Sequence, residues 1–210
     1  MNNSGLYSIL IEATRPSVIT STPTNVTFPK GKVTISPGPS SSVVDIHGYT
    51  DERQDWIITP TSIASHADKF KGYFWARISS ESPRAAVVAE YGIVNNLTVN
   101  SGLREGWGSL LSAYVLFSPT GGEEEEDTVI DVRVGTSLIS ESTARSHIET
   151  ETPQASSLED TARAVREKWV EKLDRIVVEG ASDSQREVFH TAVFHSLTVS
   201  GRVSVAMVNV

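Results

Sequence analysis

Residues 72–79 read Gly72-Tyr-Phe-Trp-Ala-Arg-Ile-Ser79 and mix aromatic with polar side chains, a pattern typical of a half-buried sheet face. Similar short runs, rich in branched residues and separated by turn formers such as Pro37-Gly-Pro39, lie on either side. No helical period occurs before about residue 140. Residues 1–140 therefore predict an antiparallel β-sandwich. The further strands expected are Tyr7–Ala13, Lys32–Ser36, Val43–His47, Asp55–Thr59, Ala85–Tyr91, Ser109–Phe117 and Thr128–Ile139.

A helical pattern replaces the β pattern after residue 155. Apolar side chains, Trp169 among them, recur at helical spacing from Leu158 to Leu173, with charged side chains opposite. Ser156 with Glu159 forms a capping-box pattern at the start of this helix. The pattern predicts a helix with Trp169 in its core-facing stripe, followed by a short strand at Arg175–Glu179.

A second helix is expected after a further capping-box pattern, Ser182 with Gln185. Residues 186–197 are apolar around much of the helix circumference, which predicts burial on more than one side. Only thirteen residues follow Leu197. We therefore expect the chain to be incomplete, and residues 186–197 to mediate self-association.

Composition excludes several classes of function. The chain of 210 residues has a net charge of −8 and no basic stripe, which disfavours nucleic acids and anionic membranes. It has no cysteine, so disulfides and cysteine metal sites are excluded. No apolar run is long enough to span a membrane, and the first residues do not form a signal peptide. The location of the protein in or outside the cell stays open.

Several segments of the chain, taken in their order along the sequence, resemble glycoside hydrolase family 92. The resemblance is good over residues 128–197 and weaker over Tyr7–Phe117. It implies a galactose-mutarotase-like β-sandwich (supersandwich) at the N-terminus, then a helical linker and an (α/α)6 barrel. The segments that carry it are Val134–Ser140, Ala144-Arg145, Ile148-Glu149, Glu151–Pro153, Arg166–Leu173 and Phe189–Leu197.

The same resemblance implies an activity. Members of family 92 are calcium-dependent, exo-acting, inverting α-mannosidases, often specific for α-1,2 linkages in mannose-containing glycans such as N-glycans. Their general acid, general base and most calcium ligands come from the barrel, which would continue past Val210. We therefore expect no catalytic residue and no bound calcium in this chain, and secretion of the full-length relatives.

The resemblance also predicts how the chain is divided. Residues 1–140 are expected to form the sandwich, 141–181 a helical linker, and 182–210 the start of the catalytic domain with an unmatched tail at 198–210. The Gly-rich segment with Phe-Pro-Gly that family members carry at the front is absent. The sequence thus predicts truncation at both ends.

Two residues are candidates for substrate binding. Trp107 lies between Gly106 and Gly108 and is either a stacking platform for a sugar or a loop residue packed on the sandwich. His195 either lines a cleft between domains or is a core or interface histidine. His190 and His195 are five residues apart, so the spacing does not favour a metal pair.

The carboxylates suggest structure more than catalysis. Glu141, Glu149 and Glu151, with Arg145 nearby, are interpreted as salt bridges between domains. The run Glu123–Asp127 is consecutive, which suits a solvated loop and not a calcium loop. Two hypotheses remain: part of an α-mannosidase-like enzyme that is inactive alone, or a non-catalytic carbohydrate-binding or interaction module.

Overall fold

The computed structural model describes residues 6–14, 30–51, 71–80, 86–120, 128–153 and 156–199. The expected strand at Asp55–Thr59 and the acidic run Glu123–Asp127 lie outside these ranges. The chain divides into two compact units, residues 1–153 and 154–210, and each is described by itself.

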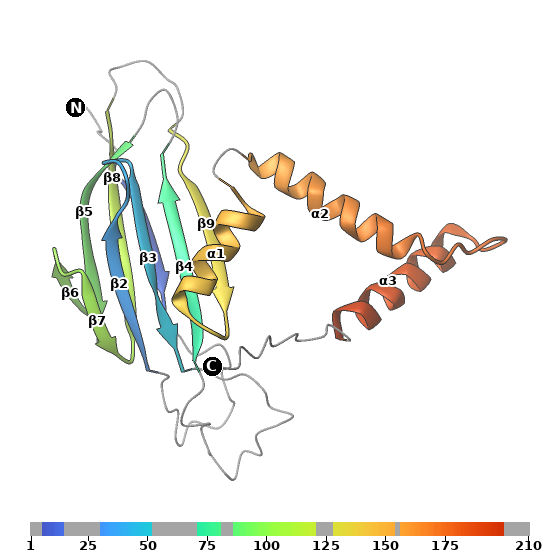
Figure 1. Cartoon of the computed structure of the whole chain (residues 1–210), viewed down its shortest axis with the longest axis horizontal. Coiled ribbons are helices and arrows are strands. Elements are labelled where there is room, and N and C mark those ends of the chain that lie inside the picture. The colour runs from blue at the N-terminus through green and yellow to red at the C-terminus, as the bar shows by residue number, and fades with distance from the viewer. Residues whose placement is uncertain are drawn as a thin grey trace, which may run out of the picture. The chain divides into compact units, whose positions relative to one another are not determined.

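The described part of the first unit contains two antiparallel sheets (Figure 1). This arrangement confirms the prediction of a mainly β, sandwich-like fold. The four-stranded sheet has the order β1 (Tyr7–Glu12), β8 (Leu111–Pro119), β5 (Ala86–Asn95), β6 (Thr98–Ser101). The five-stranded sheet has the order β7 (Glu105–Gly108), β2 (Gly31–Pro37), β3 (Val43–Thr50), β4 (Gly72–Ser79), β9 (Asp131–Ser137).

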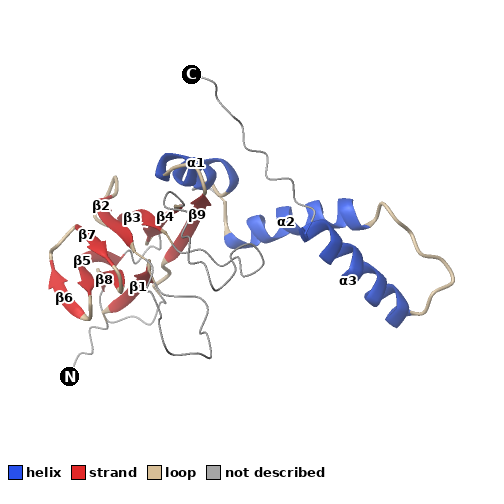
Figure 2. Ribbon diagram, turned by 90° about the horizontal axis from the view of Figure 1, so that it is seen from below, coloured by secondary structure: helices blue, strands red, loops and turns tan. Residues whose placement is uncertain are grey.

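The hydrophobic core lies between the two sheets, which Figure 2 shows nearly edge-on. Along β8 every second side chain is buried, because successive residues of a strand point to opposite faces. The five-stranded sheet contributes branched side chains from β2, β3 and β4 to the same core. The residues of this core, from both sheets, include Val33, Ile35, Val44, Ile46, Ile78, Ile93, Leu111, Val115 and Phe117.

Helix α1 (Glu141–Glu151) belongs to the first unit and covers part of its five-stranded sheet. Ser140 caps the helix by accepting a hydrogen bond from Thr143 N at 3.1 Å. Ala144 and Ile148 are buried where α1 packs on the β4–β9 end of the sheet (Figures 1 and 2). The sandwich unit therefore includes a helix that continues directly from its last strand.

The second unit contains α2 (Leu158–Leu173) and α3 (Asp183–Val199). The capping box of α2 is formed by Ser157 and Asp160, so the expectation of Ser156 with Glu159 was displaced by one residue. Asp160 can serve because its shorter side chain still reaches the backbone N–H of the cap at 3.3 Å. The box at Ser182 and Gln185 is confirmed, with Ser182 N donating to Gln185 Oε1 at 2.9 Å.

The expected strand at Arg175–Glu179 is wrong. These residues form a turn and irregular chain between α2 and α3. A run of branched residues becomes a strand only where a neighbouring strand pairs with its backbone, and the described residues of this unit are helical on both sides.

The two helices of the second unit touch through aromatic side chains. Trp169 on α2 lies 4.7 Å from Phe194 on α3, measured between ring centroids. Trp169 is half-buried, and α2 has no fully buried residue, so this contact covers only part of the predicted apolar stripe. No helix in the described ranges is long and apolar enough to cross a membrane.

Candidate functional site

The candidate site is the outer face of the five-stranded sheet, which is turned away from the core and carries polar and aromatic side chains. Strand register arranges these side chains in three rows that cross the sheet. The first row is Trp107, Lys32, Tyr49, Tyr73, Ser137. The second is Glu105, Thr34, His47, Trp75, Gly135, and the third is Ser36, Asp45, Arg77, Arg133.

His47 is the centre of a cluster that joins the second row to α1. Its ring stacks on Trp75 with the centroids 4.1 Å apart and the planes 8° apart. Its Nδ1 lies 2.5 Å from Glu141 Oε2, and its Nε2 lies 3.1 Å from Ser36 Oγ. The Arg145 guanidinium lies 5.3 Å from the centroid of Trp75. We call Ser36, His47, Trp75, Glu141 and Arg145 the His47 cluster.

The order Ser36, His47, Glu141 is the order of a serine-hydrolase relay, which raises the question of nucleophilic catalysis. Such a site also needs backbone N–H groups aimed at an oxyanion. Next to Ser36, the N–H of Ile35 instead donates to the Arg104 carbonyl at 2.7 Å. This N–H is therefore not available to an oxyanion, and what the contacts of Ser36, His47 and Glu141 show is a link between β2, β3 and α1.

A salt bridge beneath α1 occupies the third row. Arg77 donates to both carboxylate oxygens of Asp45, at 2.8 and 2.9 Å, and Asp45 is buried. These hydrogen bonds raise the pKa of the Arg77 guanidinium above its ordinary value. Arg133 donates to the carbonyl of Thr152 at 3.0 Å at the end of α1. The third row thus holds the sheet and the helix together.

The first row begins with the most exposed aromatic side chain of this face. Trp107 is 56% exposed. The Lys32 ammonium lies 5.4 Å from its ring centroid and forms an ion pair with Glu105. The hydrogen bond to Glu105 raises the pKa of Lys32. Because Trp107 is exposed, the interpretation of this residue as loop packing is not supported, whereas a role in binding stays a prediction.

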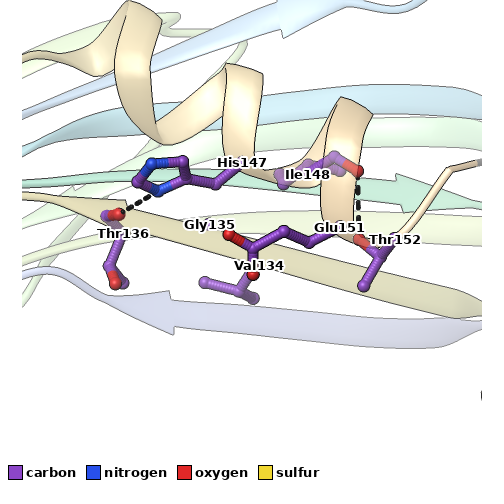
Figure 3. Close-up of a pocket in the computed structure, with 7 residues that line it drawn as sticks. All are labelled: Val134, Gly135, Thr136, His147, Ile148, Glu151 and Thr152. Atoms are coloured by element: carbon purple, nitrogen blue, oxygen red, sulfur yellow. Dashed lines mark hydrogen bonds between the residues drawn. The ribbon is translucent and has the colours of Figure 1, made fainter. Parts of the chain in front are cut away.

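A shallow pocket lies at the edge of the same face, between β9 and α1 (Figure 3). Its volume is about 140 Å³, and it is lined by polar groups that include Glu151. His147 Nδ1 lies 2.9 Å from the Thr136 carbonyl, as the dashed line in Figure 3 marks. This space is small for a sugar ring and is open to solvent, so it ranks below the outer face as a binding site.

Glu141, Glu149 and Arg145 do form ion pairs, but within the first unit. Glu141 pairs with His47, and Arg145 pairs with Glu149 at 2.8 Å one helical turn away. The sequence did not predict that His47 and Trp75 contact Glu141 and Arg145 of α1. These contacts depend on the register between neighbouring strands, which the sequence does not give.

The structure places His195 on the surface of α3, beside Phe194 at 5.6 Å between ring centroids. His190 is half-buried on the same helix, and its Nδ1 is enclosed with no hydrogen-bond partner among the described residues. His195 and Trp107 belong to different units, and a role of His195 in binding stays a prediction.

The calcium that the family resemblance implies does not fit the described residues. Calcium needs six to eight oxygen ligands that converge on one point. Within the described ranges, no group of three or more His, Asp or Glu side chains could hold a metal ion.

Known proteins resemble this chain in both sequence and fold. Residues 143–206 match the sequence model of the glycosyl hydrolase family 92 catalytic domain. No curated protein sequence matches the chain. The fold is similar to that of the family 92 inverting mannosidase BT2199 from Bacteroides thetaiotaomicron, with 23% identity over 80% of this chain and a TM-score of 0.59.

Two other solved structures show the same fold. The family 92 glycosyl hydrolase ccman5 matches over 79% of this chain with 13% identity and a TM-score of 0.56. The family 92 α-mannosidase BT3965 from Bacteroides thetaiotaomicron matches over 80% with 14% identity and a TM-score of 0.51. BT3965 has also been solved in complex with mannoimidazole, a mannose-like ligand. This chain covers 19% of the length of BT2199 and of ccman5, and 20% of BT3965.

Within the described residues, the chain thus consists of two antiparallel sheets in a sandwich-like arrangement followed by three helices, a fold shared with these solved structures. The predicted resemblance to glycoside hydrolase family 92 is confirmed in sequence over residues 143–206, and the fold agrees with that of family 92 structures over about 80% of this chain. The sequence match continues to residue 206, whereas the resemblance seen in the sequence alone stopped at Leu197.

Proposed function

We propose that this chain supplies the N-terminal β-sandwich and the first helices of the catalytic domain of an α-mannosidase-like glycoside hydrolase. The observation that carries the proposal is where the family match begins. It starts at residue 143, inside α1, and α1 packs on the sandwich. The chain therefore contains the junction between a family 92-like sandwich and a family 92 catalytic segment.

The reaction proposed for the longer enzyme is the inverting, exo-acting hydrolysis of terminal mannose, with α-1,2 linkages in mannose-containing N-glycans as the preferred substrate. Inversion uses two carboxyl groups about 6.5–9.5 Å apart, with a water molecule beside one of them. We assign both groups, and the calcium, to the barrel and not to this chain. The sandwich is expected to have the supersandwich topology and the helices to begin an (α/α)6 barrel.

The acidic side chains on the outer face support a non-catalytic role for this chain. Asp45 accepts two hydrogen bonds from Arg77, and Glu141 contacts His47. A general acid must hold a proton near neutral pH, and a general base must be free to accept one. Because Arg77 and His47 engage these two carboxylates, we assign neither of them as the general acid or the general base.

A chimera tests the proposal. The matched 19% of the BT2199 chain is replaced by this chain, and mannose release from 4-nitrophenyl α-mannoside and α-1,2-mannobiose is measured. We expect the folded chimera to release mannose with inversion and this chain alone to release none. A chimera that gives a cooperative melting transition but no activity would contradict the proposal, as would hydrolysis by the chain alone.

The second candidate function is a non-catalytic carbohydrate-binding or interaction module. The exposure of Trp107 favours it, because an exposed aromatic face can stack on the apolar face of a hexose. The two candidates differ in the role of the second unit. A stand-alone module needs only residues 1–153, so deletion of 154–210 would leave its binding unchanged, whereas the chimera without α2 and α3 would lose mannosidase activity.

A further inference from the structure

We propose that the first row of the outer face is a saccharide-binding stripe that takes a neutral hexopyranose oligosaccharide. The stripe consists of Trp107, Lys32, Tyr49 and Tyr73, and we call it the Trp107 stripe. The assignment of the ligand to the mannose class rests on the proposed function. The assignment of the stripe as a saccharide site rests only on the geometry and chemistry of these four residues.

The stripe is continuous across four strands. Trp107 is opposite Lys32, Lys32 is opposite Tyr49, and Tyr49 is opposite Tyr73. Neighbouring strands are about 4.8 Å apart, so the stripe is about 14 Å long from Trp107 to Tyr73. This length exceeds one pyranose ring, so the stripe suits an oligosaccharide better than a monosaccharide.

The polypeptide holds Trp107 outward by packing the residue before it inward. Gly106 is buried, and a Cβ at this position would lie 2.8 Å from Ile93 Cγ2 and 3.0 Å from Leu111 Cδ1. Asn95 Nδ2 donates to the Trp107 carbonyl at 3.1 Å and fixes the backbone of β7. The indole is therefore exposed on a restrained strand, which lowers the entropic cost of binding.

The side chains beside the rings supply hydrogen bonds of both kinds. Lys32 donates, and its ion-pair partner Glu105 accepts. Lys71 lies 4.1 Å from the centroid of Tyr49 and adds a second donor. The hydroxyls of Tyr49 and Tyr73 can donate or accept. A sugar presents apolar C–H faces and vicinal hydroxyls, which match alternating rings and charged groups.

Charge distinguishes a neutral sugar from the other classes of ligand. Near the stripe the cations are Lys32, which pairs with the carboxylate of Glu105, and Lys71, which lies over the ring of Tyr49. Glu141 contributes a further favourable charge to the field at Lys32. Such a mixed face favours neither a polyanion nor a polycation. Aromatic rings interrupted by charges also do not form the continuous apolar centre of a protein interface.

The experiment titrates the full chain with α-1,2-mannobiose and α-1,2-mannotriose and follows the indole N–H signals by NMR. The chain has four tryptophans, and Trp107→Phe assigns one of the four signals. We expect the Trp107 signal to shift, tighter binding of the trisaccharide, and a loss of affinity of about tenfold in Trp107→Ala. Trp107→Phe keeps a ring and should retain more affinity than Trp107→Ala.

Val99→Ala is the matched control, because Val99 is an exposed apolar residue on β6 of the other sheet. It should leave binding unchanged. No shift with either mannose oligosaccharide, nor with maltotriose or cellotriose, would overturn the stripe while leaving the chimera test of the proposed function intact. Shifts with the glucose oligosaccharides alone would keep the stripe and overturn its mannose class. Unchanged affinity in folded Trp107→Ala would place the binding elsewhere and overturn the assignment.

Discussion

Nδ1 of His47, on β3, lies 2.5 Å from Oε2 of Glu141, the first residue of α1. The two residues are 94 positions apart in the sequence. This contact links the sandwich to the helix in which the family 92 catalytic match begins. Ser36 contacts the other ring nitrogen of His47, and Trp75 stacks on the face of the imidazole ring. The pair therefore ties the first turn of α1 to the sheet.

Replacing Glu141 with Gln should loosen α1. The change keeps the size of the side chain but removes its charge, and the pair is mostly shielded from solvent, with 14% and 27% of the two side chains exposed. We expect a loss of about 1–2 kcal/mol in unfolding free energy, and faster hydrogen exchange in α1. Glu149→Gln, which breaks an exposed pair on the same helix, should cost less than about 0.5 kcal/mol. Equal effects of both changes would contradict a special role for His47 and Glu141.

Gly135→Ala should destabilise the packing of α1 on β9. A Cβ at this position would lie 2.1 Å from the Ala144 carbonyl oxygen, which is backbone and cannot move aside alone. We expect a cost of about 2–4 kcal/mol in urea unfolding. Gly72→Ala on β4 is the control, since its Cβ would meet only ordinary contacts at 3.8 Å or more. A neutral Gly135→Ala variant would mean that α1 does not pack as described.

The stability of the four-stranded sheet should depend on pH through Glu90. Hydrogen bonds from Tyr114 and then Ser101 lower the pKa of Glu90 below its ordinary value of 4.5. Because the folded-state pKa is the lower one, this stabilisation is present above pH 4.5 and is lost as the pH falls through the folded-state pKa.

Tyr114→Phe tests this dependence, because it removes the larger of the two causes. The denaturation midpoints of the original chain and of Tyr114→Phe should differ at pH 7 and converge towards pH 3, and the Glu90 titration, followed by NMR, should move upward. A difference that grows on acidification would have the wrong sign and would contradict this account.

Self-association through residues 186–197 should be reduced by Val188→Glu. Val188 is 68% exposed on α3, and a charge there opposes apolar contact between copies. Sedimentation velocity should show the original chain associating with rising concentration and the variant doing so less. Ala164→Glu, which adds the same charge at an exposed position of α2 outside residues 186–197, is the control for charge alone. A strictly monomeric original chain would contradict the prediction.

Removing calcium should leave this chain unchanged. No group of three or more His, Asp or Glu side chains that could hold a metal ion occurs in the described residues, so EDTA should not lower the melting temperature and added calcium should not raise it. A calcium-dependent rise that magnesium does not reproduce would show that the chain itself holds a site.

The sequence predicted the class of fold because the evidence for it is local. Short runs rich in branched residues, separated by turn formers, placed most strands within a few residues, and Gly72–Ser79 was predicted with its observed bounds. Ser182 with Gln185 marked the start of α3, because a capping box depends on residues only three apart. The strand predicted at Arg175–Glu179 failed because strand formation depends on a distant partner.

The sequence by itself determined the β-sandwich and the helices, since these depend on periodicity and on local signals. It also carried the resemblance to family 92, in several short segments that occur in the family's order. Only the tertiary structure decided that His47 meets Glu141, that Arg77 pairs with Asp45, and that Trp107 begins a row with Lys32. These contacts depend on strand order and register. A shift of one residue in register would turn every side chain of a strand to the opposite face, and the short segments that predict a strand carry no record of its partner.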